Sequence, residues 1–189
     1  MKNIALTILT ICLFFSCTQT YTPKPRGYFR IDFPEKAYQK FDSTCPFTFE
    51  YPKYGKIERD MDNNAEPCWI NVSFPKYKSK IHLSYKQIKS NSDRFVEDSH
   101  ELAYKHVRKA DAIDELLVDF PERKVYGIIY DIRGNAASSI QFYLTDSLHH
   151  FLRGSLYFEA QPNKDSLAPA IDFFKKDVEQ LINTLNWKK

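Results

Sequence analysis

The second half of the chain constrains the fold most, because three stretches with strand character lead directly into one long amphipathic helix. Residues 125–132 are apolar on both faces and so are expected to be central, 140–144 alternate, and 148–158 form the third stretch of a meander. A helix is predicted to follow, since apolar residues recur with helical spacing. They are Leu167, Ala170, Ile171, Phe174, Val178, Leu181, Ile182 and Leu185. Sequential strands closed by such a helix indicate an antiparallel sheet covered by helices.

Short polar and glycine-containing stretches predict the turns and the start of this helix. Gly134-Asn135 suits a two-residue hairpin. Asp165 or Ser166 is expected to cap the helix. Pro169 is expected in the first turn, where a missing backbone N–H is tolerated.

The first half of the chain is expected to be β-rich. From residue 92 to 110 the apolar period becomes that of a helix, and 113–120 either extends this helix or forms a separate element. Alternating apolar residues predict strands at 28–33, 47–51, 68–74 and 81–85.

Together these elements predict an α+β fold in which an antiparallel sheet of about six or seven strands is covered by helices. The element order resembles the Mog1/PsbP-like sandwich, a likeness that assigns no function. We expect one such domain over residues 27–189.

The N-terminus carries the pattern of a bacterial lipoprotein export signal. Lys2 precedes an apolar stretch over 4–15 that is too short to span a bilayer, and Ser16 precedes Cys17. We expect residues 1–16 to be removed and acyl chains to be attached to Cys17. A plain secretory signal, with Cys17 as an ordinary thiol, and an uncleaved helix are the alternatives.

Residues 17–26 are expected to tether the domain to the lipid. Pro23 and Pro25 favour extended backbone geometry in this stretch. The protein should therefore stay attached to the membrane through its lipid while its domain projects from the surface.

Export into an oxidising compartment bears on the other cysteines. Cys45 and Cys68 are predicted to form one disulfide, and two free buried thiols are the alternative. With Cys12 and Cys17 set aside, no second cysteine pair or nearby histidine supports a zinc site, so no metal is expected.

Residue patterns that catalysis needs are scarce. The nearest is the group Asp146, Ser147, His149 and His150, but neighbouring side chains on a turn and a strand point to opposite sides. His150 is expected to be a hydrogen-bonded core residue on the face of Leu148 and Leu152. We predict no enzymatic activity and no cofactor, and a hydrolase built around His150 and Asp146 is the weakest alternative.

The charge balance excludes a further class of partner. The chain has 27 lysines and arginines against 24 aspartates and glutamates, without the basic stripe of a nucleic-acid-binding protein. No nucleic-acid partner is therefore expected.

Several stretches carry a resemblance to a known family. They are Pro23-Lys24-Pro25, Ile31-Asp32-Phe33-Pro34, Lys105-His106, Lys109-Ala110-Asp111, Val125-Tyr126-Gly127, Thr145-Asp146-Ser147, His150-Phe151, Gly154-Ser155-Leu156-Tyr157-Phe158, Pro162-Asn163, Asp165-Ser166 and Leu185-Asn186-Trp187. In these the sequence resembles the gliding-motility lipoprotein D (GldD) family of the Bacteroidetes group. The resemblance implies a cell-envelope lipoprotein needed for gliding and for the linked type IX protein secretion, with no known enzymatic activity.

The resemblance also bears on location. Surface-exported lipoproteins of that group tend to carry acidic residues after the lipidated cysteine, whereas Thr18-Gln19-Thr20-Tyr21 follows here. We therefore expect a lipid-anchored protein of the outer membrane whose domain faces the periplasm.

Bacteria of this group also O-glycosylate Asp-Ser/Thr tripeptides that end in an aliphatic residue or Thr. Ser43, Ser147 and Ser166 are therefore candidate acceptors, of which one is expected to be modified. Asp-Ser also favours turns and helix caps for local reasons.

We therefore expect a non-enzymatic, membrane-tethered module that contacts other proteins of the gliding and type IX secretion machinery. The candidate contact residues are His149, Arg153, Asn163 and Asp165, near the last hairpin and the start of the helix. The alternative is a periplasmic domain that binds a ligand, either a peptidoglycan fragment or a lipid.

Overall fold

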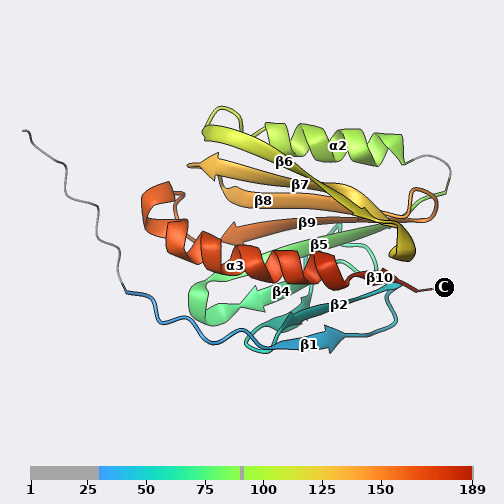
Figure 1. Ribbon diagram of the computed structural model, residues 1–189, viewed down its shortest axis with the longest axis horizontal. Helices are drawn as coiled ribbons and strands as arrows, with labels where there is room; N and C mark the ends of the chain where they lie inside the picture. Colours follow the sequence, from blue (N-terminus) through green and yellow to red (C-terminus); the bar gives the residue numbers. More distant parts are fainter. Residues whose placement is uncertain (1–29, 90–91, 189) are drawn as a thin grey trace, which may run out of the picture.

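The computed structural model describes residues 30–89 and 92–188, and the expected signal segment, Cys17 and the tether lie outside them. The described chain forms two antiparallel sheets and two α-helices (Figure 1). The large sheet has the order β3 (Lys56–Arg59), β4 (Ile70–Phe74), β5 (Ser79–Gln87), β9 (His150–Phe158), β8 (Ser138–Thr145), β7 (Val125–Gly134), β6 (Ala110–Phe120). The small sheet has the order β1 (Tyr38–Phe41), β2 (Phe47–Pro52), β10 (Asn186–Trp187).

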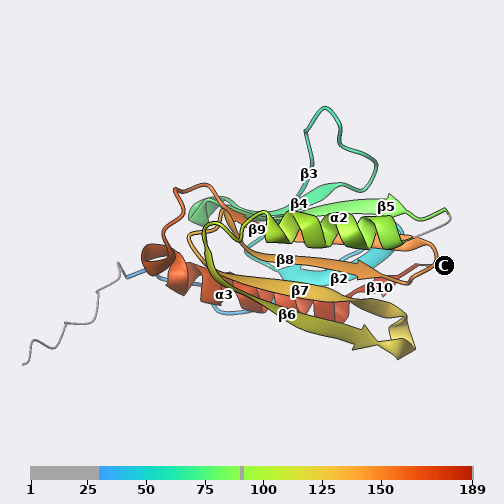
Figure 2. The ribbon, with the colours of Figure 1, turned by 90° about the horizontal axis from the view of Figure 1, so that it is seen from above.

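The two helices cover opposite faces of the large sheet, as Figure 2 shows. α3 (Lys164–Thr184) packs with the small sheet over the larger core, which includes Phe47, Val72, Leu83, Leu144, Leu152 and Phe174. α2 (Asp93–Tyr104) covers a smaller core on the other face, formed by Ile88, Ala103, Tyr130, Ile132, Ala136, Tyr143 and Phe151. The expected α+β class, an antiparallel sheet covered by helices, is confirmed.

The meander predicted for the second half is present, because β7, β8 and β9 pair in order. All residues of β8 are buried, so β8 rather than β7 is covered on both faces, and β9 is the middle strand. β7 ends at Gly134 with φ of 116°, and β8 begins only at Ser138. The connection is therefore longer than the two-residue hairpin that was expected.

The start of α3 differs from the prediction. Asn163, rather than Asp165 or Ser166, is the N-cap, and its side-chain oxygen accepts a hydrogen bond from the Ser166 N–H at 3.2 Å. Pro169 lies in the second turn, not the first, because the helix begins at Lys164.

The first half contains one wrong prediction and resolves one open alternative. Of the strand expected over 28–33, the described residues belong to an irregular segment, and β1 is the first strand in the part of the chain that the structure describes. The predicted helix ends at Tyr104, and the ambiguous stretch forms β6, an edge strand that pairs with β7. Two short 3-10 helices, η1 (Pro75–Tyr77) and η2 (Pro121–Arg123), join β4 to β5 and β6 to β7.

Two glycines allow close packing within the meander. A Cβ atom on Gly154 would lie 2.1 Å from the Phe142 ring, which crosses β9 at this point. A Cβ atom on Gly127 would lie 1.9 Å from the carbonyl oxygen of Tyr143. Both distances are far shorter than any van der Waals contact, so a larger residue would displace the Phe142 ring at Gly154 and the backbone of β8 at Gly127.

Candidate functional site

The turn between β8 and β9 is organised by Asp146. Its Oδ1 atom accepts hydrogen bonds from the backbone N–H groups of Leu148 at 3.0 Å, His149 at 2.7 Å and His150 at 2.8 Å. Burial alone raises the pKa of the Asp146 carboxyl, but these donors outweigh burial and hold the pKa below its ordinary value. Ser147 has φ of 68° in the same turn. Asp146 therefore acts as a turn-forming residue whose carboxylate oxygen is already engaged.

His150 lies between two aromatic side chains. The Tyr85 hydroxyl is 2.8 Å from its Nδ1 atom, and its ring stacks on Trp187 with centroids 5.0 Å apart. Burial lowers the pKa of the His150 imidazole, although Asp146 acts in the opposite direction. Leu148 does not share this face as expected, because it is 64% exposed in the turn. The arrangement is that of a packed, hydrogen-bonded histidine.

The next two predicted residues lie in different settings. The His149 side chain is 68% exposed, and its Nδ1 atom is 3.6 Å from Asp146. Arg153 is half-buried on the face that α2 partly covers, and its guanidinium donates to Gln141 Oε1. Burial lowers the pKa of the Arg153 guanidinium. His149 is thus accessible to a partner, while Arg153 already has a hydrogen-bond acceptor.

Asn163 and Asp165 are at the other end of β9 from His149. The nine residues of β9 span roughly 25–30 Å, so the structure does not bring the four candidates onto one small surface. Asn163 serves as the N-cap of α3, and Asp165 lies in the first turn. The four residues therefore stay separate candidates for partner contact.

The remaining predicted site residues are placed as follows. Cys45 and Cys68 form a disulfide with Cα atoms 5.6 Å apart, which ties the β1–β2 loop to the segment before β4. Ser43, Ser147 and Ser166 are all exposed. Each serine is therefore sterically open to a modifying enzyme.

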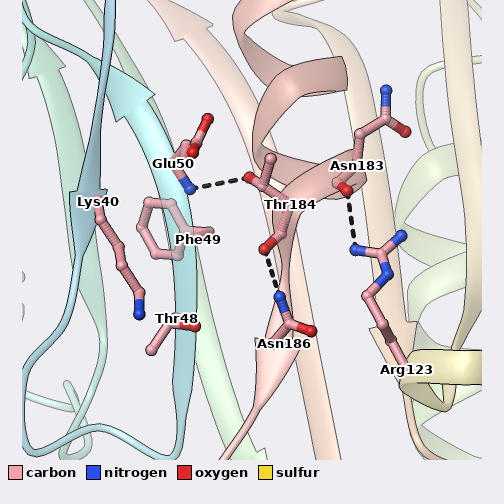
Figure 3. Close-up of a pocket in the computed structure, with 8 residues that line it drawn as sticks. All are labelled: Lys40, Thr48, Phe49, Glu50, Arg123, Asn183, Thr184 and Asn186. Atoms are coloured by element: carbon pink, nitrogen blue, oxygen red, sulfur yellow. Dashed lines mark hydrogen bonds between the residues drawn. The ribbon is translucent and has the colours of Figure 1, made fainter.

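Sequence reasoning missed a polar pocket of about 410 Å³ beside the C-terminal end of α3 (Figure 3). The Thr184 hydroxyl, two residues before β10 begins, accepts a hydrogen bond from the Glu50 N–H at 2.9 Å. Arg123 donates to the Asn183 carbonyl at 2.8 Å. The pocket is lined by Lys40, Thr48, Phe49, Glu50, Arg123, Asn183, Thr184 and Asn186. Its amides, hydroxyls and charged groups can hydrogen-bond a small polar ligand.

A second pocket, of about 380 Å³, lies between the start of α3 and the ends of β6 and β7. Ala168 and Ile171 give it an apolar wall, and two ion pairs border it. These pairs are Lys164 with Asp111 at 2.6 Å and Lys175 with Asp131 at 2.5 Å. The mixture suits an amphipathic ligand better than a fully polar one.

Two features are absent from residues 30–89 and 92–188. No group of three or more His, Cys, Asp or Glu residues in this part of the chain could hold a metal ion. None of its helices is long and apolar enough to cross a membrane.

The comparisons with known proteins identify a family. A family model described as gliding motility lipoprotein GldD matches residues 18–187. No curated protein matches the sequence. Among solved structures, cyanobacterial PsbP (CyanoP) from Synechocystis sp. PCC 6803 is similar, with 9% identity and a TM-score of 0.48 over 82% of this chain and 94% of that chain. This structural likeness is too low to support a functional argument.

Proposed function

Because this chain belongs to the gliding motility lipoprotein GldD family, we propose that it supports gliding, and the linked type IX secretion, as a non-enzymatic protein that binds other envelope proteins. The observation that carries this proposal is the family match over nearly the whole chain, residues 18–187. Because the match covers the folded domain, this domain is the part that the chain shares with the family.

The proposed location is the periplasmic side of the outer membrane. Acyl chains on Cys17 would hold the protein there, and each buried methylene contributes about 0.8 kcal/mol to membrane binding. The polar residues that follow Cys17 support retention on the periplasmic side.

The absence of enzymatic activity is proposed from the state of the best candidate residues. The Asp146 oxygen Oδ1 already accepts three backbone N–H groups, and His150 is packed between Tyr85 and Trp187. A general base needs access to a substrate proton, and neither group offers it in this arrangement.

Partner contact is proposed at the four predicted residues, which are distributed along β9 and beyond both of its ends. His149 and the exposed Leu148 form the tip of the β8–β9 turn. Asn163 and Asp165 lie at the opposite end of β9, and Arg153 lies between. Among these, the turn tip offers an apolar and a polar side chain together without disturbing a helix cap.

The experiment places a photoreactive amino acid at position 149 in gliding cells, with position 61 as the matched control because Met61 is 86% exposed. We expect crosslinks from position 149 to envelope proteins of the gliding machinery and none of these from position 61. His149→Ala should reduce gliding and remove the same proteins from the co-purifying set. Loss of gliding with an unchanged set would contradict partner docking at this turn.

A second candidate function is ligand binding, which the pocket in Figure 3 favours. Its volume of about 410 Å³ falls within the usual range for small-molecule sites, and its amide and hydroxyl lining suits a peptidoglycan fragment. Titration of the protein with a soluble muropeptide tests this candidate. Shifts in the NMR signals of the Asn183 and Asn186 amides would support it, and unchanged signals would exclude it.

O-glycosylation at Ser43, Ser147 or Ser166 is also proposed. The native protein should carry a mass increase that disappears when the modified serine is replaced by alanine. A mass increase that survives replacement of all three would refute the assignment.

A further inference from the structure

One end of the large sheet gathers exposed cations from three connections. The strand register brings these connections to the same end of the sheet. In it, Phe74 lies opposite Ser79, Ser79 opposite Phe158, and Ala110 opposite Gly134. We call this end the basic end, and its cations are Lys53, Lys56, Lys76, Lys78, Arg108 and Lys109. They come from the β2–β3 turn and the first residue of β3, from η1 and its C-cap, and from the turn between α2 and β6.

Within the described residues, none of these six cations forms an ion pair. Lys76 makes a cation–π contact instead, because its Nζ atom lies 5.4 Å from the centre of the Tyr77 ring. Two exposed carboxylates at this end are neutralised, since Asp32 pairs with Arg30 at 3.1 Å and Asp111 with Lys164 at 2.6 Å. Glu35 and Glu159 are also exposed there, which leaves an excess of positive charge.

The described chain begins at this same end. Figure 1 shows its first segment on the side where α3 starts and where α2 turns into β6. Tyr77 of η1 donates a hydrogen bond to the Asp32 carbonyl at 3.1 Å, and the Lys53 N–H donates to the Ala37 carbonyl at 2.8 Å. The N-terminal end of the described chain therefore lies at the basic end.

We propose that the basic end lies against an anionic lipid surface, so that phospholipid headgroups neutralise its cations. The inference rests on the proposed membrane attachment in one respect, because that attachment places the lipid on the N-terminal side of the domain. Seven strands are roughly 30 Å wide, so the cations are spread over a broad front, which suits a planar surface better than a single bound anion. Val107, which is 52% exposed beside Arg108, can enter the headgroup region.

This arrangement orients the domain. Attachment at a single point does not by itself fix the orientation of the domain, but cations near an anionic surface favour the orientation that brings them within a Debye length of it. His149 and Leu148 are at the opposite end of β9 and would then point away from the lipid, toward the periplasmic space. The membrane-facing and partner-facing ends of the domain are thereby separated.

The test uses the chain from residue 17 onward with Cys17→Ser, which keeps every described element and has no acyl chain. Its sedimentation with vesicles of phosphatidylcholine is compared with that on vesicles containing about 30% phosphatidylglycerol. The test variant carries Lys76→Gln, Arg108→Gln and Lys109→Gln. The matched control removes three exposed cations at the other end, outside the pocket in Figure 3, with Lys89→Gln, Arg94→Gln and Lys124→Gln.

The parent chain and the control are expected to bind the anionic vesicles and not the neutral ones. The test variant should bind them at least about ten-fold more weakly, since each cation near the surface contributes roughly five-fold. Equal binding by the test variant and the control, or no preference for anionic vesicles, would overturn the inference. Because no acyl chain is present, such a failure would leave the proposed role of Cys17 and of partner contacts untouched.

Discussion

The Lys36 ammonium lies 2.8 Å from the Oδ2 atom of Asp177, a carboxylate whose side chain has no exposed surface. The same carboxylate accepts hydrogen bonds from Tyr54 at 2.5 Å and from Tyr38 at 3.1 Å. Burial, together with the Asp177 charge, raises the pKa of Tyr38 to about 12, and burial lowers the pKa of Lys36. This group fastens the irregular segment before β1 to the middle of α3. Any pull on the N-terminus would therefore be resisted by the core helix.

Removing the cation of this pair should destabilise the fold strongly. Lys36→Met would leave Asp177 buried with two neutral donors, so we expect the free energy of unfolding to fall by about 3 kcal/mol. Lys40→Met is the control, because Lys40 is 63% exposed and lies 3.6 Å from Asp42, and it should change stability by less than about 0.5 kcal/mol. Urea unfolding followed by circular dichroism measures both. Similar midpoints for the two variants would show that the buried pair adds little.

The disulfide should contribute through the loop that it closes. Cys45 and Cys68 are separated by 23 residues, which corresponds to about 3 kcal/mol in the chain-entropy model. A reductant should lower the urea midpoint of the native chain and leave that of the Cys45→Ala, Cys68→Ala double variant unchanged. If the reductant had no effect on the native chain, the two cysteines would not be bonded in solution.

The two close contacts in the meander predict different responses to alanine. Gly154→Ala should destabilise the protein by about 2–3 kcal/mol, because its Cβ meets the Phe142 ring, and Phe142→Leu in the same chain should recover part of the loss. Gly127→Ala should destabilise it at least as much, but with no recovery by Phe142→Leu, because its Cβ meets the Tyr143 backbone. Thermal unfolding of the parent chain, of the three single variants, including Phe142→Leu alone, and of the two double variants completes both cycles. Equal recovery in both backgrounds would refute the assigned contacts.

Stability should decrease on mild acidification. Burial lowers the pKa of His82, His106 and His150 from the ordinary value of 6.5. The unfolded chain therefore binds protons near this pH that the folded chain does not, and the free energy of unfolding falls as pH drops through it. Urea midpoints measured from about pH 8 to about pH 5 should show this decrease, with a smaller decrease in His150→Phe. A midpoint that is constant over this range would contradict the assigned pKa directions.

The sequence correctly predicted the elements in which the apolar period recurs over many residues. The stripe of α3 and the alternation of β8 each involve many residues on one face, so local irregularities do not obscure them. The strand expected over 28–33 failed because Phe33 is held by tertiary contacts, with its ring stacked 4.2 Å from that of Phe173. Periodicity alone cannot distinguish such a packed irregular segment from a strand.

The candidate sites were less predictable than the fold. The stretch that forms β6 remained ambiguous because the run Leu116-Leu117-Val118 fits both a helix and a strand. Its position at the edge of the sheet is defined only by its pairing with β7. The pocket beside α3 draws Lys40, Arg123 and Thr184 from distant parts of the chain, so no local motif marks it. His149 was predicted as a contact residue, but its distance from Asn163 depends on the full length of β9.

The most direct test of the account is the incorporation of labelled palmitate, measured with gliding speed, in cells whose chromosomal copy carries Cys17→Ala. Cys12→Ala is the matched control, because this cysteine lies in the expected signal segment. The account predicts that Cys17→Ala abolishes both labelling and gliding while Cys12→Ala preserves both. Cells that still glide at normal speed with an unlabelled Cys17→Ala protein would contradict it.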